Sequence, residues 1–161
     1  MEILLDTANI EAIKKYHDVI NLAGVTTNPT IVKKEGKIDF FDHMRKIREI
    51  IGQDAHFHIQ AVGTTKEDYI KDASTIWKEI DDDVFVKIPT TEAGLAAIKQ
   101  LKSEGKPITA TGVYTEFQAY LAMSCGADYI VPYYNRMRKM NIEALAFIKN
   151  VSEVIKRENS R

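Results

Sequence analysis

The sequence predicts a parallel α/β fold of the (β/α)8 TIM-barrel type, of which the 161 residues contain about six βα units. Short β-rich runs alternate with amphipathic helical runs along the chain, which is typical of parallel sheets. The run from Asp83 to Pro89 carries apolar residues on both faces, as strands buried on both sides do. An open doubly wound sheet is the alternative architecture, but the chain contains no dinucleotide-binding fingerprint.

The first half of the chain predicts three strands, each followed by a helix. The strands are expected at residues 2–6, 24–28 and 56–61. The helices are expected from about 8 to 19, from about 40 to 51, and from the capping threonines Thr64 and Thr65 onward. Gly52 is the expected stop of the second helix.

The second half repeats the pattern after the strand that ends at Pro89. Helices are expected from about Glu92 to Gly105 and after Thr115, whose pairing with Gln118 is a capping-box signature. Strands are expected at 107–112 and 127–132, a loop at 133–136, and a last helix at about 142–156 with a buried stripe of Ile148, Val151 and Ile155.

No linker composition divides the chain, so we expect one barrel domain over residues 1–161. A complete barrel usually takes about 250 residues, so this domain is expected to be C-terminally incomplete.

The composition excludes several classes of partner. The 22 basic and 23 acidic side chains nearly cancel, which gives no reason to expect nucleic acid or an anionic membrane surface. No window holds the ~18 apolar residues of a membrane span. One cysteine, Cys125, fits a reducing compartment, and we expect a cytoplasmic protein. His56 and His58 share a strand face, but two histidines without a third ligand do not predict a metal site.

Lys87 is the candidate nucleophile because it lies inside the apolar run from Asp83 to Pro89, which is expected to form a buried strand. A lysine there is costly unless it is paired or neutral, and burial can lower a lysine pKa by up to ~3–5 units from about 10.4. A neutral amine could form a Schiff base with a carbonyl substrate. The alternative is a lysine whose stem packs and whose head reaches solvent or a carboxylate.

Polar residues at the strand ends support the functional interpretation. Counting back in steps of two from each strand end places one residue per strand on the same inward face as Lys87. In a parallel barrel, catalytic groups collect at the carboxyl ends of the strands. The set consists of Asp6, Asn28, Gln60, Lys87, Thr111 and Tyr133.

Four motifs resemble the transaldolase family, and specifically its small fructose-6-phosphate aldolase-like branch. They are Leu-Asp-Thr-Ala-Asn at 5–9, Gly-Val-Thr-Thr-Asn-Pro-Thr at 24–30, Val-Lys-Ile-Pro-Thr-Thr-Glu-Ala-Gly-Leu at 86–95 and Pro-Tyr-Tyr-Asn-Arg at 132–136. The resemblance implies that Lys87 forms a Schiff base with a ketone donor, and that no metal or organic cofactor is needed.

The resemblance implies substrate contacts in the first half of the chain. Asp6 and Asn28 would bind or orient the hydroxyls of the donor and the imine, with Thr26 among the substrate-binding residues. Asp6 could instead cap a helix, and Asn28 could form an Asx turn before Pro29.

The resemblance also implies residues for proton transfer. Gln60 and Thr111 would position a water, and Tyr133 would be the acid or base at the substrate hydroxyl. Structural polar packing is the alternative for Gln60 and Thr111. Arg136 would hold an acceptor phosphate, or would be a solvated loop arginine.

Two positions favour the aldolase branch: this chain has Gln60 where transaldolases typically carry Glu, and Tyr133 where they carry Phe. The implied enzyme is a class I aldolase that joins dihydroxyacetone to an aldehyde such as glyceraldehyde 3-phosphate, or cleaves that product. Its partners would be sugars or sugar phosphates and further copies of itself in a homo-oligomer. The alternatives are a transaldolase and a non-catalytic truncated barrel.

Overall fold

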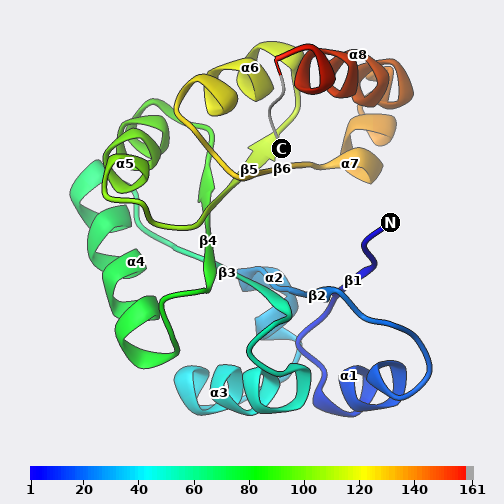
Figure 1. Ribbon diagram of the computed structural model, residues 1–161, viewed down its shortest axis with the longest axis vertical. Coiled ribbons are helices and arrows are strands. Elements are labelled where there is room, and N and C mark those ends of the chain that lie inside the picture. The colour runs from blue at the N-terminus through cyan, green and yellow to red at the C-terminus, as the bar shows by residue number, and fades with distance from the viewer. Residues whose placement is uncertain (159–161) are drawn as a thin grey trace. The chain divides into compact units, whose positions relative to one another are not determined.

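The computed structural model describes residues 1–158 of the chain, which divide into two compact units (Figure 1). The first unit comprises residues 1–62 and 71–86. The second comprises residues 63–70 and the chain from Lys87 onward. Both units are built from parallel strands and helices, which confirms the predicted α/β class.

The first unit has three parallel strands in chain order: β1 (Leu4–Asp6), β2 (Gly24–Thr26) and β3 (His56–Gln60). A Cβ atom on Gly24 would lie only 2.0 Å from the backbone oxygen of His56, so the close approach of β2 to β3 requires glycine here. The register sets Asp6 opposite Thr26, and Thr26 opposite His58. The carboxyl ends of β1 and β2 are therefore level with each other.

Helices of the first unit begin at polar caps. The side chains of Asn9, Asn28 and Asp39 accept backbone N–H bonds at the starts of α1 (Ile10–His17), α2 (Pro29–Lys33) and α3 (Phe40–Ile51). Helices α1 and α3 lie side by side (Figure 1). Helix α4 spans Lys66–Glu79, and its part from Lys71 belongs to this unit. Buried apolar side chains between strands and helices form the core: Val25, Met44, Ile47, Phe57, Ile59 and Ile76.

One buried cation fastens α3 to the chain after α4. Arg48 is 8% exposed, and its guanidinium donates to the Asp81 carboxylate at 2.8 Å and to the backbone oxygens of Gly52 and Ala55. Its charge also lies 5.4 Å from the ring centre of Phe57. Because the guanidinium donates to a carboxylate and to two backbone oxygens and lies against an aromatic ring, this buried charge is compensated.

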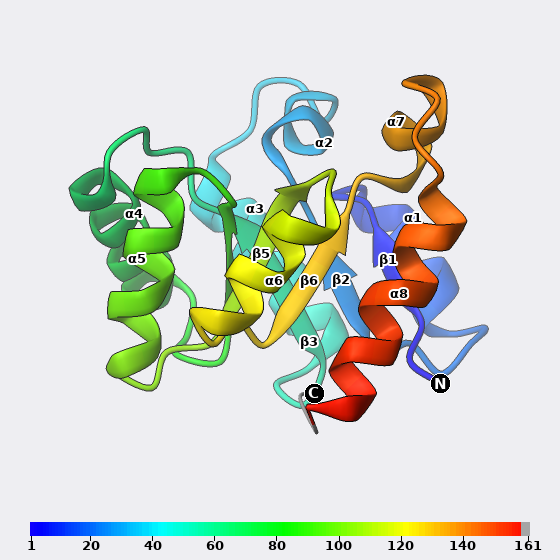
Figure 2. The same cartoon turned by 90° about the horizontal axis from the view of Figure 1, so that it is seen from above.

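Besides residues 63–70, the second unit contains the chain from Lys87, inside β4, through α8. Strand β5 pairs in parallel with β6, and helices α6 and α8 lie side by side (Figure 2). A core cluster that includes Val113, Met137 and Phe147 joins them. The elements are β4 (Phe85–Pro89), α5 (Glu92–Ser103), β5 (Ile108–Val113), α6 (Glu116–Ser124), β6 (Tyr129–Pro132), α7 (Tyr134–Lys139) and α8 (Ala144–Arg157).

Strand β5 contains a bulge. Its register against β6 shifts between Ala110 and Val113, and Gly112 between them has φ of 68°. Only glycine adopts such a left-handed conformation without strain, and a bulge changes the direction of the side chains that follow it. The side chains that follow Gly112 therefore point in directions that the regular two-residue alternation of a strand would not give them.

The predicted strands and most predicted helices are confirmed, including the capping box of Thr115 and Gln118. Two predictions are wrong. Residues 134–139 form helix α7 where a loop was expected at 133–136. On α8, Val151 is buried and Ile155 partly buried as predicted, but Ile148 is exposed, because Ala144 and Phe147 form the rest of the buried stripe. The single barrel domain stays a prediction.

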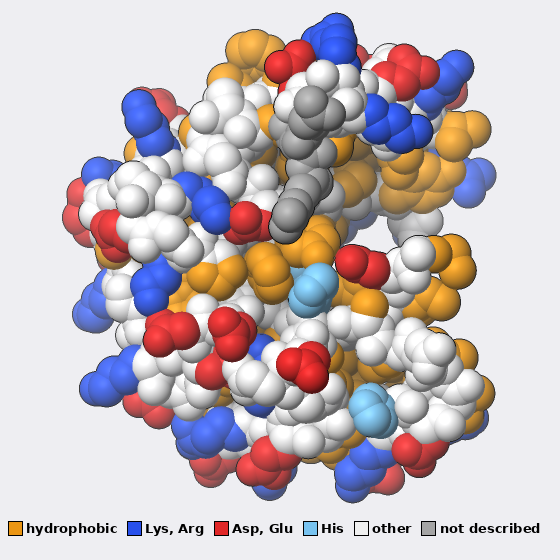
Figure 3. All heavy atoms as spheres, viewed as in Figure 1, with side chains coloured by type: hydrophobic (Ala, Val, Ile, Leu, Met, Phe, Trp, Pro, Cys, Tyr) orange, Lys and Arg blue, Asp and Glu red, His pale blue; other side chains and the backbone are white. Residues whose placement is uncertain are grey.

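One face of the molecule is drawn in Figure 3 with its side chains coloured by type. Positive and negative side chains alternate over the face in Figure 3 and do not form one basic patch. Among the described residues, no helix is both long and apolar enough to cross a bilayer.

Candidate active site

The first unit carries four of the predicted site residues at or just beyond the ends of β1, β2 and β3. Asp6 ends β1 and is exposed, and Thr26 ends β2 directly opposite it. Asn28 follows β2 and Gln60 ends β3, and both are partly buried. These four side chains thus emerge from one edge of the three-stranded sheet.

The local alternatives for Asp6 and Asn28 are resolved differently. Helix α1 is capped by Asn9, so the suggestion that Asp6 is a helix cap is wrong. Asn28 does have a local role, because its Oδ1 accepts the backbone N–H of Ile31 at 3.0 Å and caps α2. That bond occupies the carbonyl oxygen only, and it fixes the direction of the side-chain NH2 group, which is a donor.

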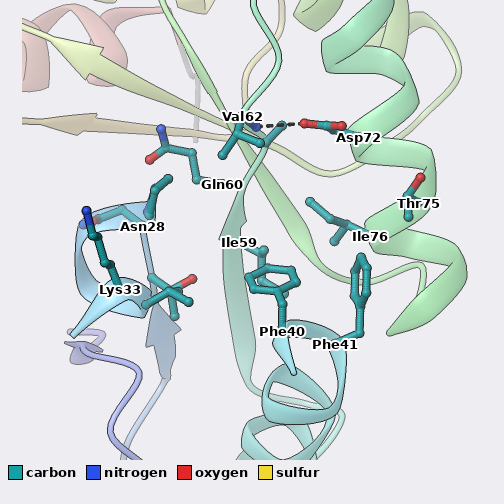
Figure 4. Close-up of a pocket in the computed structure, with 14 residues that line it drawn as sticks. Asn28, Lys33, Phe40, Phe41, Ile59, Gln60, Val62, Asp72, Thr75 and Ile76 are labelled. Carbon is teal, nitrogen blue, oxygen red and sulfur yellow. Dashed lines mark hydrogen bonds between the residues drawn. The ribbon is translucent and has the colours of Figure 1, made fainter. Parts of the chain in front are cut away.

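Gln60 and Asn28 form part of the wall of a cavity of about 500 Å³ (Figure 4). Its polar side includes Asn28, Lys33 and Gln60, and its apolar side includes Phe40 and Phe41. The Oε1 atom of Gln60 is buried, and no described protein group bonds to it. A buried acceptor without a donor is uncommon and costly, so it marks a place where a water or a substrate hydroxyl could bind.

The second unit carries the other four predicted site residues. Lys87 lies in the middle of β4 and is only 2% exposed, as expected for a lysine in a buried strand. Thr111 lies in β5 and is fully buried. Among the described residues, its Oγ1 atom also lacks a hydrogen-bond partner. Two of the predicted site residues, Gln60 and Thr111, therefore share this unusual feature, each within its own unit.

Tyr133 and Arg136 are brought into direct contact. Tyr133 precedes α7, and its backbone N–H donates to the Val113 oxygen at 3.2 Å, which ties it to β5. The Arg136 guanidinium lies 4.6 Å from the centre of the Tyr133 ring. Arg136 is thus held against a predicted catalytic residue, although it is exposed.

Tyr114 completes this group and was missed by the sequence analysis. Its ring meets the Tyr133 ring edge-on, with centres 5.4 Å apart. A side-chain hydrogen bond with Tyr114 raises the pKa of Arg136, and attraction to Tyr114 and Tyr133 adds to the effect. The available signal was Gly112, because a glycine inside a predicted strand suggests a bulge that changes the direction of the next side chains.

The two histidines of β3 have packing roles. His58 stacks on Phe85 with ring centres 5.0 Å apart, and His56 meets the same ring edge-on and lies 3.8 Å from the Glu2 carboxylate. Within residues 1–158, no cluster of three or more His, Cys, Asp or Glu side chains could hold a metal ion.

Comparison with solved structures shows likeness of fold. A racemase from Streptomyces coelicolor A3(2) gives a TM-score of 0.63 at 14% identity, over 99% of this chain and 45% of that one. A mandelate racemase/muconate lactonizing enzyme-like protein from Rubrobacter xylanophilus gives 0.59 at 16% identity, over 98% and 44%. At such identities the likeness concerns the fold alone.

Comparison of sequences is more specific. The chain is 48% identical to a "Probable fructose-6-phosphate aldolase" of Streptococcus pneumoniae, over 99% of this chain and 72% of that protein. It is 36% identical to a "Probable transaldolase" of Brachyspira hyodysenteriae, over 96% and 70%. A family model described as Transaldolase/Fructose-6-phosphate aldolase matches residues 3–160. The chain therefore belongs to the transaldolase/fructose-6-phosphate aldolase family.

Proposed function

We propose that this protein is a class I aldolase of the fructose-6-phosphate aldolase type, with Lys87 as its Schiff-base residue. The observation that carries the proposal is the burial of Lys87, 2% exposed, in a strand of a chain that belongs to this family. Burial disfavours the charged ammonium form and so favours the amine that attacks a carbonyl.

The reaction would begin with dihydroxyacetone. The Lys87 amine adds to the ketone carbon, and the resulting carbinolamine takes up one proton and loses one water to give an iminium. Removal of a proton from the adjacent hydroxymethyl carbon gives an enamine, which attacks the aldehyde carbon and forms the new C–C bond. The alkoxide takes up a proton, and water hydrolyses the iminium to release the product and free Lys87. Each step is reversible, so the same residues would cleave the sugar.

Proton transfer would use Tyr133 and a water held by Gln60 and Thr111. Each of these two side chains has a buried oxygen to which no group in residues 1–158 donates, which supports a role in holding water. Tyr133 supplies a phenol that can give or take a proton. Gln60 is neutral and cannot act as a carboxylate base.

The remaining residues would bind the substrates. Asp6, Thr26 and Asn28 would meet the hydroxyls of the donor, and their common sheet edge supports this role. Arg136 would bind the phosphate of an acceptor such as glyceraldehyde 3-phosphate, because a guanidinium recognises phosphate with two parallel N–H donors.

The proposed setting is a (β/α)8-type barrel in a homo-oligomer that works in the cytoplasm. The barrel is supported by the family and by parallel strands in both units.

A transaldolase is the second candidate, because several relatives bear that name. The test compares free cleavage of fructose 6-phosphate with transfer of its three-carbon unit to erythrose 4-phosphate, using coupled detection of glyceraldehyde 3-phosphate. The proposal predicts cleavage without an added acceptor aldehyde, and abolition of that activity by Lys87→Met. Turnover only when erythrose 4-phosphate is present would establish a transaldolase. Folded protein with neither activity would favour the non-catalytic alternative.

A further inference from the structure

Tyr114 stands at the centre of a small contact group in the second unit. Its ring packs edge-on against Tyr133, and its side chain is the largest cause of the raised pKa of Arg136. The guanidinium of Arg136 in turn covers the ring of Tyr133 at 4.6 Å. Three side chains, from the ends of β5 and β6 and from α7, thus restrain one another.

The backbone fixes Tyr114 from both sides. The bulge at Gly112 immediately precedes it, and the Thr90 hydroxyl donates to the Gly112 oxygen at 3.3 Å. On its other side the capping box of α6 begins, where Gln118 Oε1 accepts the N–H of Tyr114 at 2.9 Å. A side chain anchored between a bulge and a capped helix is well suited to hold a more mobile one.

The Arg136 side chain gains from such a restraint because it is exposed. An exposed arginine has many rotamers, and fixing it on a ligand costs conformational entropy. A partner that already restrains the guanidinium removes part of this cost before the ligand arrives. The contact with the face of the Tyr133 ring limits one direction of motion, and the attraction to Tyr114 limits another.

We propose that Tyr114 is a positioning residue, whose hydroxyl presents Arg136 to the phosphate of the acceptor and whose ring holds the Tyr133 phenol in place. This inference rests on the proposed aldolase function and adds to it a determinant of preference for phosphorylated over unphosphorylated aldehydes.

The test uses two substitutions with separate effects, assayed for addition of dihydroxyacetone to D-glyceraldehyde 3-phosphate and to D-glyceraldehyde. Tyr114→Phe removes only the hydroxyl, and we expect KM for the phosphorylated aldehyde to rise about five-fold, with kcat and KM for glyceraldehyde within about two-fold of wild type. Tyr114→Leu also removes the ring, and we expect kcat to fall about ten-fold with both aldehydes because Tyr133 loses its edge-on neighbour. Tyr120→Phe is the matched control, since its hydroxyl bonds Glu116 away from this group, and it should change neither constant.

The outcomes separate the inference from the function on which it rests. Equal KM increases with both aldehydes, or no increase with Tyr114→Phe, would overturn the inference while leaving the aldolase intact. Wild-type protein without turnover would instead refute the proposed function.

A second readout does not need turnover: the Nε–H resonance of Arg136 is followed by NMR while inorganic phosphate is added. A phosphate-induced shift that weakens in Tyr114→Phe would support positioning of Arg136. An equal shift in both proteins, or none in wild type, would overturn it.

Discussion

Replacing Thr111 by valine should make the protein more stable and less active. Thr111 is fully buried, and its hydroxyl has no bonding partner within the described part of the chain. Valine has nearly the same shape but puts a methyl group where the hydroxyl lies. The substitution therefore removes a buried polar group that no described residue satisfies and leaves the surrounding packing in place.

The expected gain follows from the cost of such a group. A buried donor or acceptor without a partner costs ~1–3 kcal/mol, and part of this returns when the group is replaced by an apolar one. We expect Thr111→Val to raise the free energy of unfolding by about 1 kcal/mol, or the Tm by about 2–4 °C. If Thr111 binds the water for proton transfer only when substrate is present, its hydroxyl is unsatisfied in the free protein, and turnover should still fall ~100-fold in the same variant, within the usual range of acid–base contributions.

Urea unfolding of wild type and variant would measure the change, and Thr90→Val is the matched control. Thr90 is 7% exposed, but its hydroxyl donates to the Gly112 oxygen, so the control should lose about 1 kcal/mol. A Thr111→Val protein that is less stable than wild type would refute the reasoning, because it would mean that the Thr111 hydroxyl is already satisfied in the folded state. Unchanged turnover would refute its catalytic role separately.

Three further predictions concern the scaffold. Asp68 accepts hydrogen bonds from Thr65, and these bonds lower the pKa of its carboxyl. The ionised carboxylate therefore stabilises the fold above pH ~4, and this contribution is lost as the pH falls through the lowered pKa of the folded protein. Asp68→Asn should lower the urea midpoint at pH 7 and leave it unchanged at pH 2. Gly94→Ala should destabilise by ~1–3 kcal/mol or more, because its Cβ would lie 1.9 Å from the Pro89 oxygen, and an unchanged Tm would contradict that contact. Arg48→Ala should lower the free energy of unfolding by ~3–5 kcal/mol, measured by chemical denaturation, because it leaves a partly buried carboxylate and two backbone carbonyls without their donor. A loss below about 1 kcal/mol would show that the fold does not need this charge.

Much of the fold was predictable because local signals agreed with it. Apolar alternation identified the strands, and the capping box at Thr115 and the glycine stop at Gly52 predicted helix ends that the structure confirms. The errors occurred where local signals are weak. Helix α7 has no side-chain cap, and its run of arginine and lysine resembles a solvated loop. On α8, Ala144 and Phe147 are buried and Ile148 is not. The buried face is the one that packs against α6 and α7, and it does not coincide with the most hydrophobic stripe of the helix.

The candidate site was predictable in its members but not in its contacts. Strand periodicity placed Lys87 and Thr111 in buried strands, as observed. An Asx turn was the predicted local alternative for Asn28, and in the structure its side chain caps helix α2. Nothing in the spacing predicted that Tyr114 would meet Tyr133, since the bulge that precedes Tyr114 departs from the two-residue alternation.

The central claim is that Lys87 forms a Schiff base. Its most direct test is the intact mass of the protein incubated with dihydroxyacetone and borohydride, with peptide mapping of the product and Lys87→Met as the control. A reduced donor adduct of about 74 Da on Lys87, absent from the control, is the result expected from iminium formation and reduction. Correctly folded protein that gains no mass, or that gains it on another lysine, would contradict the claim.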